Sequence, residues 1–181
     1  PATELHAMCR EAVARILSSE ELLDRCRIPF AARDLVAESW RRDDPELYGR
    51  FDLIHASPAE PDGAAKMIEY NADTPTSLFE ASSFQWTWLE EQIAAGVLPA
   101  DADQFNAIHE AIRDRFAEIF APGTDVHFAS LGGRANAEDY GTVETLAYMA
   151  RDAGLGAHYT DLATIGLTTE GQFADSEARV I

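Results

Sequence analysis

A strand–helix–strand pattern in the C-terminal third of the chain most constrains its fold. Strand-like residues 126–130 precede a helical segment at about 138–153, which Gly154 closes, and a second strand-like segment follows at 157–162. A helix between two strands returns the chain across a sheet, so that the strands run parallel. The sequence therefore predicts an α/β fold with a βαβ unit. LGGR at 131–134 is interpreted as a permissive loop, with a substrate crevice at the strand end as the alternative.

Helical periodicity predicts several flanking helices. The first third of the chain is mainly helical, with a cap at Ser18-Ser19 and a third helix at 30–42. Two longer helices are expected at about 77–95 and 103–120. The apolar stripe of the second consists of Phe105, Ile108, Ile112, Phe116 and Ile119. A last hairpin turns at TEG and returns through FADSEARVI to the C-terminus.

Two further strand-like segments, 50–57 and 64–71, flank the turn-rich loop PAEPDG and predict a β-hairpin. If Ser57 pairs with Ala64, Asp52 stands opposite Glu69, and Arg50 opposite Asn71, all on one polar face. The same register gathers Phe51, Tyr70, Leu53 and Ile68 on an apolar face.

The polar face of this hairpin predicts a magnesium site. Opposed carboxylates with Cβ atoms about 5 Å apart repel unless a cation lies between them. Oxygen donors from Asp52, Glu69 and the Asn71 amide suit Mg²⁺, and Arg50 beside them could clamp a phosphate. The alternative is a solvent-facing hairpin on which Arg50 neutralises a carboxylate.

Charge and composition exclude several classes of partner. The chain carries 32 acidic against 14 basic side chains, a net charge of −18, with Lys66 as its one lysine. This argues against nucleic acid and anionic membranes as partners. No long apolar run and no signal-peptide pattern is present, which predicts a cytoplasmic protein. Cys9 and Cys26 are interpreted as reduced thiols, and no residue pattern indicates an oligomeric state.

Longer motifs resemble a known family. YGRFD at 48–52 and EYNADTPTSLFEASSFQWTWLEEQ at 69–92 look like the synthetase part of the glutathionylspermidine synthase family, closest to its bacterial stand-alone acid–amine ligases. The resemblance continues through VHF at 126–128, EDYGTVETLAYMARDAGL at 138–155 and the IGLTTEGQF hairpin. It implies an ATP-grasp ligase that joins a carboxylic acid to an amine through an acyl-phosphate, with Mg²⁺ and with ATP as co-substrate.

The resemblance also implies residue roles. Arg50 would contact phosphate and the transition state, and Asp52, Glu69 and Asn71 would bind Mg²⁺. The acid, a peptide-like small molecule, would bind at Thr74 and Thr76, and the amine at Glu138 and Asp139. A turn and helix cap at the threonines, and helix capping by the acidic pair, are the structural alternatives.

The expected architecture is the N-terminal part of an ATP-grasp synthetase: a pre-ATP-grasp-like βαβ unit, a metal-ligand β-hairpin and flanking helices. Residues 1–45 are expected to form an N-terminal helical region and 46–181 the synthetase part, with the nucleotide clamp beyond Ile181. This segment alone is therefore expected to be inactive. A catalytically silent peptide- or polyamine-binding module on the same fold is the second hypothesis, and a structural domain the third.

Overall fold

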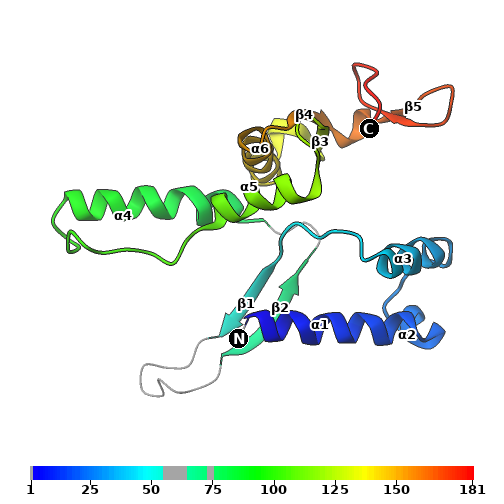
Figure 1. Cartoon of the computed structure of the whole chain (residues 1–181), viewed down its shortest axis with the longest axis horizontal. Helices are drawn as coiled ribbons and strands as arrows, with labels where there is room; N and C mark the ends of the chain where they lie inside the picture. The colour runs from blue at the N-terminus through cyan, green and yellow to red at the C-terminus, as the bar shows by residue number, and fades with distance from the viewer. Residues whose placement is uncertain (1, 55–64, 73–75) are drawn as a thin grey trace. The chain divides into compact units, whose positions relative to one another are not determined.

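The computed structural model describes residues 2–54, 65–72 and 76–181 and is drawn in Figure 1. The chain divides into two compact units, which we describe separately. The first comprises Pro1–Glu46 and Phe51–Glu69, and the second Leu47–Arg50 and Tyr70–Ile181. The limits expected from sequence, 1–45 and 46–181, stay a prediction. No helix in the described ranges is both long and apolar enough to span a membrane.

The first unit begins with three helices, as the sequence predicts: α1 (Ala2–Leu17), α2 (Glu20–Arg25) and α3 (Phe30–Arg42). The Ser19 side chain accepts a hydrogen bond from the Leu22 N–H at 3.3 Å, which confirms the expected cap. Arg33 of α3 binds both Glu20 and Asp24 of α2. These ion pairs therefore link α3 to α2.

The hairpin strands are β1 (Arg50–Ile54) and β2 (Lys66–Asn71), which pair with each other and run in opposite directions (Figure 1). The expected strand tips and loop at 55–64 lie outside the described residues. On the expected apolar face, Phe51 and Tyr70 are half-buried, whereas Leu53 and Ile68 are exposed. The register that opposes Asp52 to Glu69 stays a prediction.

The βαβ unit is confirmed in the second unit of the chain. Strands β3 (Asp125–Ser130) and β4 (Gly156–Asp161) run parallel, and α6 (Ala137–Asp152) connects them and contacts both. Gly132 precedes a 3₁₀ turn, η2 (Gly133–Ala135), and has φ of 78°, which fits the expected permissive loop. The core consists of Leu78, Ile112, Phe116, Phe128, Ala147, Met149, Ala150 and Leu155.

The helix expected at 77–95 contains an irregular turn. A π-helical segment, η1 (Glu80–Phe84), precedes α4 (Gln85–Ala94). The carbonyl of Ala81 in this turn accepts a hydrogen bond at 2.7 Å from the side-chain amide of Asn106. A π turn displaces backbone carbonyls from the regular helical ladder, and such turns are frequent at functional sites.

The expected start of the next helix at 103 is wrong, because α5 spans Ile108–Ile119. The Asn106 side chain accepts from the Ile108 N–H at 3.3 Å, and this local bond competes with the helix before that point. Phe105 is fully exposed and does not belong to the apolar stripe, whereas Ile112 and Phe116 are buried.

The C-terminal hairpin is confirmed as β5 (Gly166–Leu167) and β6 (Phe173–Ala174), which pair antiparallel after the 3₁₀ turn η3 (Leu162–Thr164). The expected return limb is not one continuous strand. The chain turns after Asp175, Ala178 adopts φ of 62°, and Val180 pairs back with Ala174. A buried side chain at Asp175 causes this turn, as described below.

Candidate functional site

A close backbone approach forms the base of the hairpin. A Cβ atom on Gly49 would lie 2.6 Å from a ring carbon of Tyr70 and 3.1 Å from the Asn71 carbonyl oxygen. A side chain at this position would require the Tyr70 ring and the Asn71 backbone to shift, which favours glycine here. Gly49, which precedes Arg50, thus lies against Tyr70 and Asn71 at the end of β2. Arg50 and Asn71 both belong to the second unit.

Arg50 is held by a backbone contact. Its Nη1 donates a hydrogen bond of 3.0 Å to the carbonyl oxygen of Thr76. Ser77, the next residue, has φ of 66°, in the left-handed region that side-chain-bearing residues rarely adopt. Such backbone strain clusters at ligand and active sites. The half-buried Thr76 thus lies within hydrogen-bond reach of the predicted phosphate-binding guanidinium.

A crevice of about 300 Å³ opens beside this contact. Three chain segments form it: Leu47–Arg50, the Thr76–Ala81 segment and α5. Burial raises the pKa of the Tyr48 phenol in its wall, and the positive charge of Arg50 opposes this rise without cancelling it. The Tyr48 hydroxyl therefore stays protonated at neutral pH.

The predicted metal ligands divide between the two units. Asp52 is half-buried on β1 and Glu69 exposed on β2, both in the first unit, whereas Asn71 belongs to the second. Within the residues described, no three His, Cys, Asp or Glu side chains form a group that could hold a metal ion. The predicted set offers two carboxylates and one amide. Its assignment to Mg²⁺ stays a prediction.

The remaining predicted substrate-binding residues are Thr74, Glu138 and Asp139. Thr74 lies outside the described residues. Glu138 and Asp139 occupy the first turn of α6. Asn136 donates to the Asp139 carboxylate at 2.5 Å and accepts from the Asp139 N–H at 3.4 Å. Asp139 thus takes part in capping α6, as the structural alternative proposed, while Glu138 is exposed.

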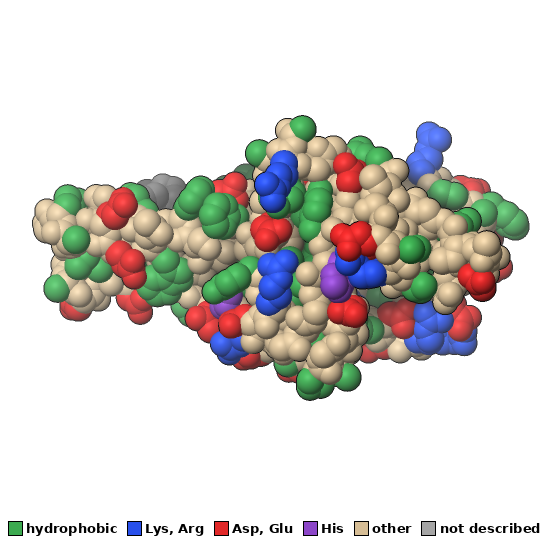
Figure 2. All heavy atoms as spheres, turned by 90° about the horizontal axis from the view of Figure 1, so that it is seen from above, with side chains coloured by type: hydrophobic (Ala, Val, Ile, Leu, Met, Phe, Trp, Pro, Cys, Tyr) green, Lys and Arg blue, Asp and Glu red, His purple; other side chains and the backbone are tan. Residues whose placement is uncertain are grey.

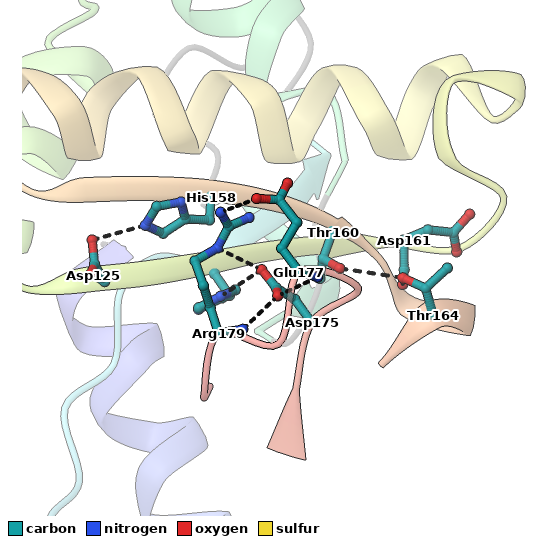
Figure 3. Close-up of polar contacts among 9 residues, drawn as sticks. Asp125, His158, Thr160, Asp161, Thr164, Asp175, Glu177 and Arg179 are labelled. Atoms are coloured by element: carbon teal, nitrogen blue, oxygen red, sulfur yellow. Dashed lines mark hydrogen bonds and ion pairs between the residues drawn. The ribbon is translucent and has the colours of Figure 1, made fainter. Parts of the chain in front are cut away.

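A polar cluster around Asp175 escaped the sequence analysis. The buried Asp175 carboxylate accepts the backbone N–H groups of Glu177 and Arg179, each at 2.9 Å, and the Arg179 Nε at 2.8 Å (Figure 3). Burial alone would raise the pKa of Asp175, but these hydrogen bonds and the Arg179 charge lower it below its ordinary value. Asp175 therefore fixes the turn that ends the C-terminal hairpin.

Two histidines lie on the sheet face beneath this turn. His127 and His158 occupy paired positions on β3 and β4, with ring centroids 5.3 Å apart. The buried His127 Nε2 lies 3.3 Å from the Asp175 carboxylate, outside hydrogen-bond geometry, and His158 pairs with Asp125 at 2.8 Å (Figure 3). The cluster attaches the C-terminal segment to the sheet, which is a structural role.

The acidic side chains are dispersed on the face shown in Figure 2, with basic side chains beside several of them. Representative exposed pairs are Arg151 with Glu144 at 3.6 Å and Arg113 with Asp114 at 2.7 Å. The net charge of −18 therefore does not concentrate in a single patch on this face.

These features are typical of a pre-ATP-grasp fragment, and the family comparison agrees. The chain belongs to the family described as glutathionylspermidine synthase preATP-grasp, which matches residues 1–181. The family expected from the RFD and EYNAD motifs and the α/β architecture expected from the strand–helix–strand pattern are both confirmed.

Two curated relatives are similar to the chain. A Haemophilus influenzae protein named "Putative acid--amine ligase" is 38% identical over 170 residues, which cover 92% of the chain and 40% of that protein. Trypanothione synthetase of Crithidia fasciculata is 31% identical over 88 residues, which cover 49% of the chain and 13% of that protein. The chain thus spans well under half of the length of either relative, and both are named as ligases or synthetases.

The YGRFD motif predicts roles for Arg50 and Asp52 but none for Tyr48 or Gly49. A glycine directly before the predicted phosphate-binding arginine was a usable signal, because close backbone approach is a common reason for glycine. Ala81 and Ala111 give no comparable signal, since only the tertiary fold brings them into the crevice that Arg50 lines.

Proposed function

We propose that the protein containing this chain is an ATP- and Mg²⁺-dependent ligase that joins a carboxylic acid to an amine. The observation that carries the proposal is the family match over residues 1–181, with the RFD and EYN motifs on paired strands. Arg50 beside Thr76 supports it, because a guanidinium held by a backbone carbonyl is a preorganised anion contact. In this proposal the acid is activated as an acyl-phosphate.

Each motif residue has a role in the proposed reaction. Asp52, Glu69 and Asn71 would hold Mg²⁺, which neutralises charge on the phosphates of ATP. Arg50 would bind the transferring phosphoryl group, where a planar guanidinium can make a two-point contact. Transfer of the γ-phosphoryl group to the acid carboxylate releases ADP, and attack by the amine on the acyl-phosphate then releases inorganic phosphate and forms the amide.

The substrate contacts follow the same proposal. Thr74 and Thr76 would contact a peptide-like acid, because they directly follow the motif that supplies the metal ligands. Glu138 and Asp139 would attract the amine, although capping of α6 engages Asp139. The relative named trypanothione synthetase supports an amide-forming class without fixing either substrate for this chain.

ADP release by the intact protein tests the proposal. With MgATP and a panel of thiol peptides, short peptides and polyamines, we expect ADP to accumulate only when a suitable acid and amine are both present. Salt-sensitive polyamine binding without any ADP release across the panel would instead favour the catalytically silent binding module.

A further inference from the structure

We infer that the crevice beside Arg50 binds the apolar side chain of the acid substrate and thereby selects acids that carry such a side chain next to the reacting carboxylate. This inference rests on the proposed ligase function and specifies its acid. The crevice lies entirely in the second unit, between the Leu47–Arg50 segment, the Thr76–Ala81 segment and α5.

The walls of the crevice are apolar. Leu78 and Ile112 are each 5% exposed and belong to the core, and Ile108 packs against that core. Ala81 and Ala111 complete the wall with short side chains, one from the π turn and one from α5. Apolar walls gain free energy by excluding water from an apolar group and would penalise a buried phosphate or ammonium ion.

Polar residues also line the crevice. Tyr48, Arg50 and Thr76 are among its lining residues, and Arg50 is oriented by its 3.0 Å bond to the Thr76 carbonyl. A guanidinium has five N–H donors in a planar fork, which suits a carboxylate. An acid substrate with its carboxylate at Arg50 and its apolar side chain against Leu78 and Ile112 matches this arrangement. An amine substrate does not, because its positive charge is opposite to that of the carboxylate.

The volume of the crevice fits a side chain better than a whole nucleotide. A volume of about 300 Å³ is at the lower limit of small-molecule sites, about 300–1,000 Å³. It accommodates an aliphatic or aromatic side chain rather than a base, ribose and triphosphate together. The carboxylate at Arg50 would then lie where the proposed phosphoryl transfer occurs.

The π-helical turn η1 supplies one residue of the crevice wall, Ala81, and has features of a functional segment. Asn106 donates to the Ala81 carbonyl at 2.7 Å and thus fixes the position of Ala81 against the crevice. The hydroxyl of Ser82, the following residue, is buried and has no hydrogen-bond partner among the residues that the structure describes. The protein thus keeps an irregular turn and a buried unsatisfied hydroxyl beside the crevice, which is consistent with a functional rather than a packing origin.

Filling the crevice mouth tests the inference. Ala111 is exposed on α5, so Ala111→Leu adds bulk at the crevice without displacing core residues. Ala117 is exposed on the same helix and does not line the crevice, so Ala117→Leu is the matched control. The intact protein would be assayed for ADP release with MgATP, hydroxylamine as the nucleophile, and the acids N-acetylglycine, N-acetylalanine, N-acetylleucine and N-acetylphenylalanine.

We expect kcat/KM of the unmodified protein to rise about tenfold or more from N-acetylglycine to N-acetylleucine, as hydrophobic pockets discriminate. Ala111→Leu should remove this rise while the KM for ATP and the thermal midpoint match those of Ala117→Leu. ADP release without side-chain preference, or an unchanged preference in Ala111→Leu, would overturn the inference alone. No ADP release with these acids or with the wider peptide panel would overturn the proposed function as well.

Discussion

The Arg50 guanidinium donates a 3.0 Å hydrogen bond from Nη1 to the carbonyl oxygen of Thr76, and so joins the base of β1 to the segment that enters the following helix. Arg50 and Thr76 both belong to the second unit of the chain. The hydrogen bond fixes the guanidinium at the rim of the crevice rather than in open solvent.

Replacing Arg50 should therefore impair chemistry more than folding. Arg50→Ala is expected to lower the rate of ADP release about 10²- to 10³-fold, the usual loss for one preorganised contact to transition-state charge. Arg50→Lys should recover only part of the rate, because an ammonium lacks the planar fork. Steady-state assays check this, with Arg41→Ala on the exposed surface of α3 as the control. An Arg50→Ala enzyme with full activity would exclude Arg50 from the reaction.

Glu69→Gln tests the proposed metal site. The substitution keeps the shape of an exposed side chain but removes the charge that would bind Mg²⁺. We expect ADP release to fall about a hundredfold or more, because a catalytic metal supplies several kcal/mol of charge stabilisation. Rates measured against Mg²⁺ concentration check this, and Glu91→Gln, an exposed residue of α4, serves as the control. The same rate and Mg²⁺ dependence in Glu69→Gln and the unmodified protein would contradict the assignment.

The core around Phe116 should dominate the stability of the second unit. Phe116 is 2% exposed and packs edge-on against Phe128, with ring centroids 6.1 Å apart. Phe116→Ala is expected to lower the free energy of unfolding by about 3–5 kcal/mol. Phe105→Ala, at a fully exposed position, should change it little. Urea unfolding of the intact protein distinguishes the two, and equal losses would contradict the observed packing.

The Asp175 turn should depend on pH. The pKa of Asp175 is below its ordinary value, so the native state binds this proton less tightly than the unfolded state. Its contribution to stability is then complete above the ordinary pKa near 4 and is lost as the pH falls through the lowered native value. We expect Asp175→Asn to lower the melting temperature by a few degrees at pH 7, and this gap to shrink below about pH 4.

Thermal unfolding of the unmodified protein and of Asp175→Asn between pH 3 and pH 8 measures this difference in melting temperature. Glu177→Gln is the control, because Glu177 is exposed and its side chain contacts Arg179 only at the surface. A gap that is independent of pH would show that the Asp175 charge does not hold the turn.

The sequence predicted those elements whose periodicity agrees with their packing. α3 has the expected limits, and the βαβ unit has the expected parallel strands, because their apolar spacing matches the faces that they bury. The start of α5 was missed because Asn106 competes with the helix through side-chain hydrogen bonds. The turn after Asp175 differs from the expected strand because the Asp175 carboxylate accepts the backbone N–H groups of Glu177 and Arg179, a local alternative to strand pairing.

The candidate site was predictable only in part, for a similar reason. The motifs identified Arg50 and its neighbours on the hairpin, since short-range alternation decides which residues share a strand face. The crevice combines Tyr48, Ala81 and Ala111 from three separate segments. Their proximity depends on how α5 packs against the Thr76–Ala81 segment, which no local pattern encodes.

Oxygen-isotope transfer tests the central proposal most directly. The acid substrate would be labelled with ¹⁸O in its carboxylate and turned over by the intact protein with MgATP and the amine. Formation of an acyl-phosphate and its aminolysis transfer one carboxylate oxygen to inorganic phosphate, so we predict one ¹⁸O atom in phosphate per amide formed. Amide formation with unlabelled phosphate would contradict activation of the acid through an acyl-phosphate.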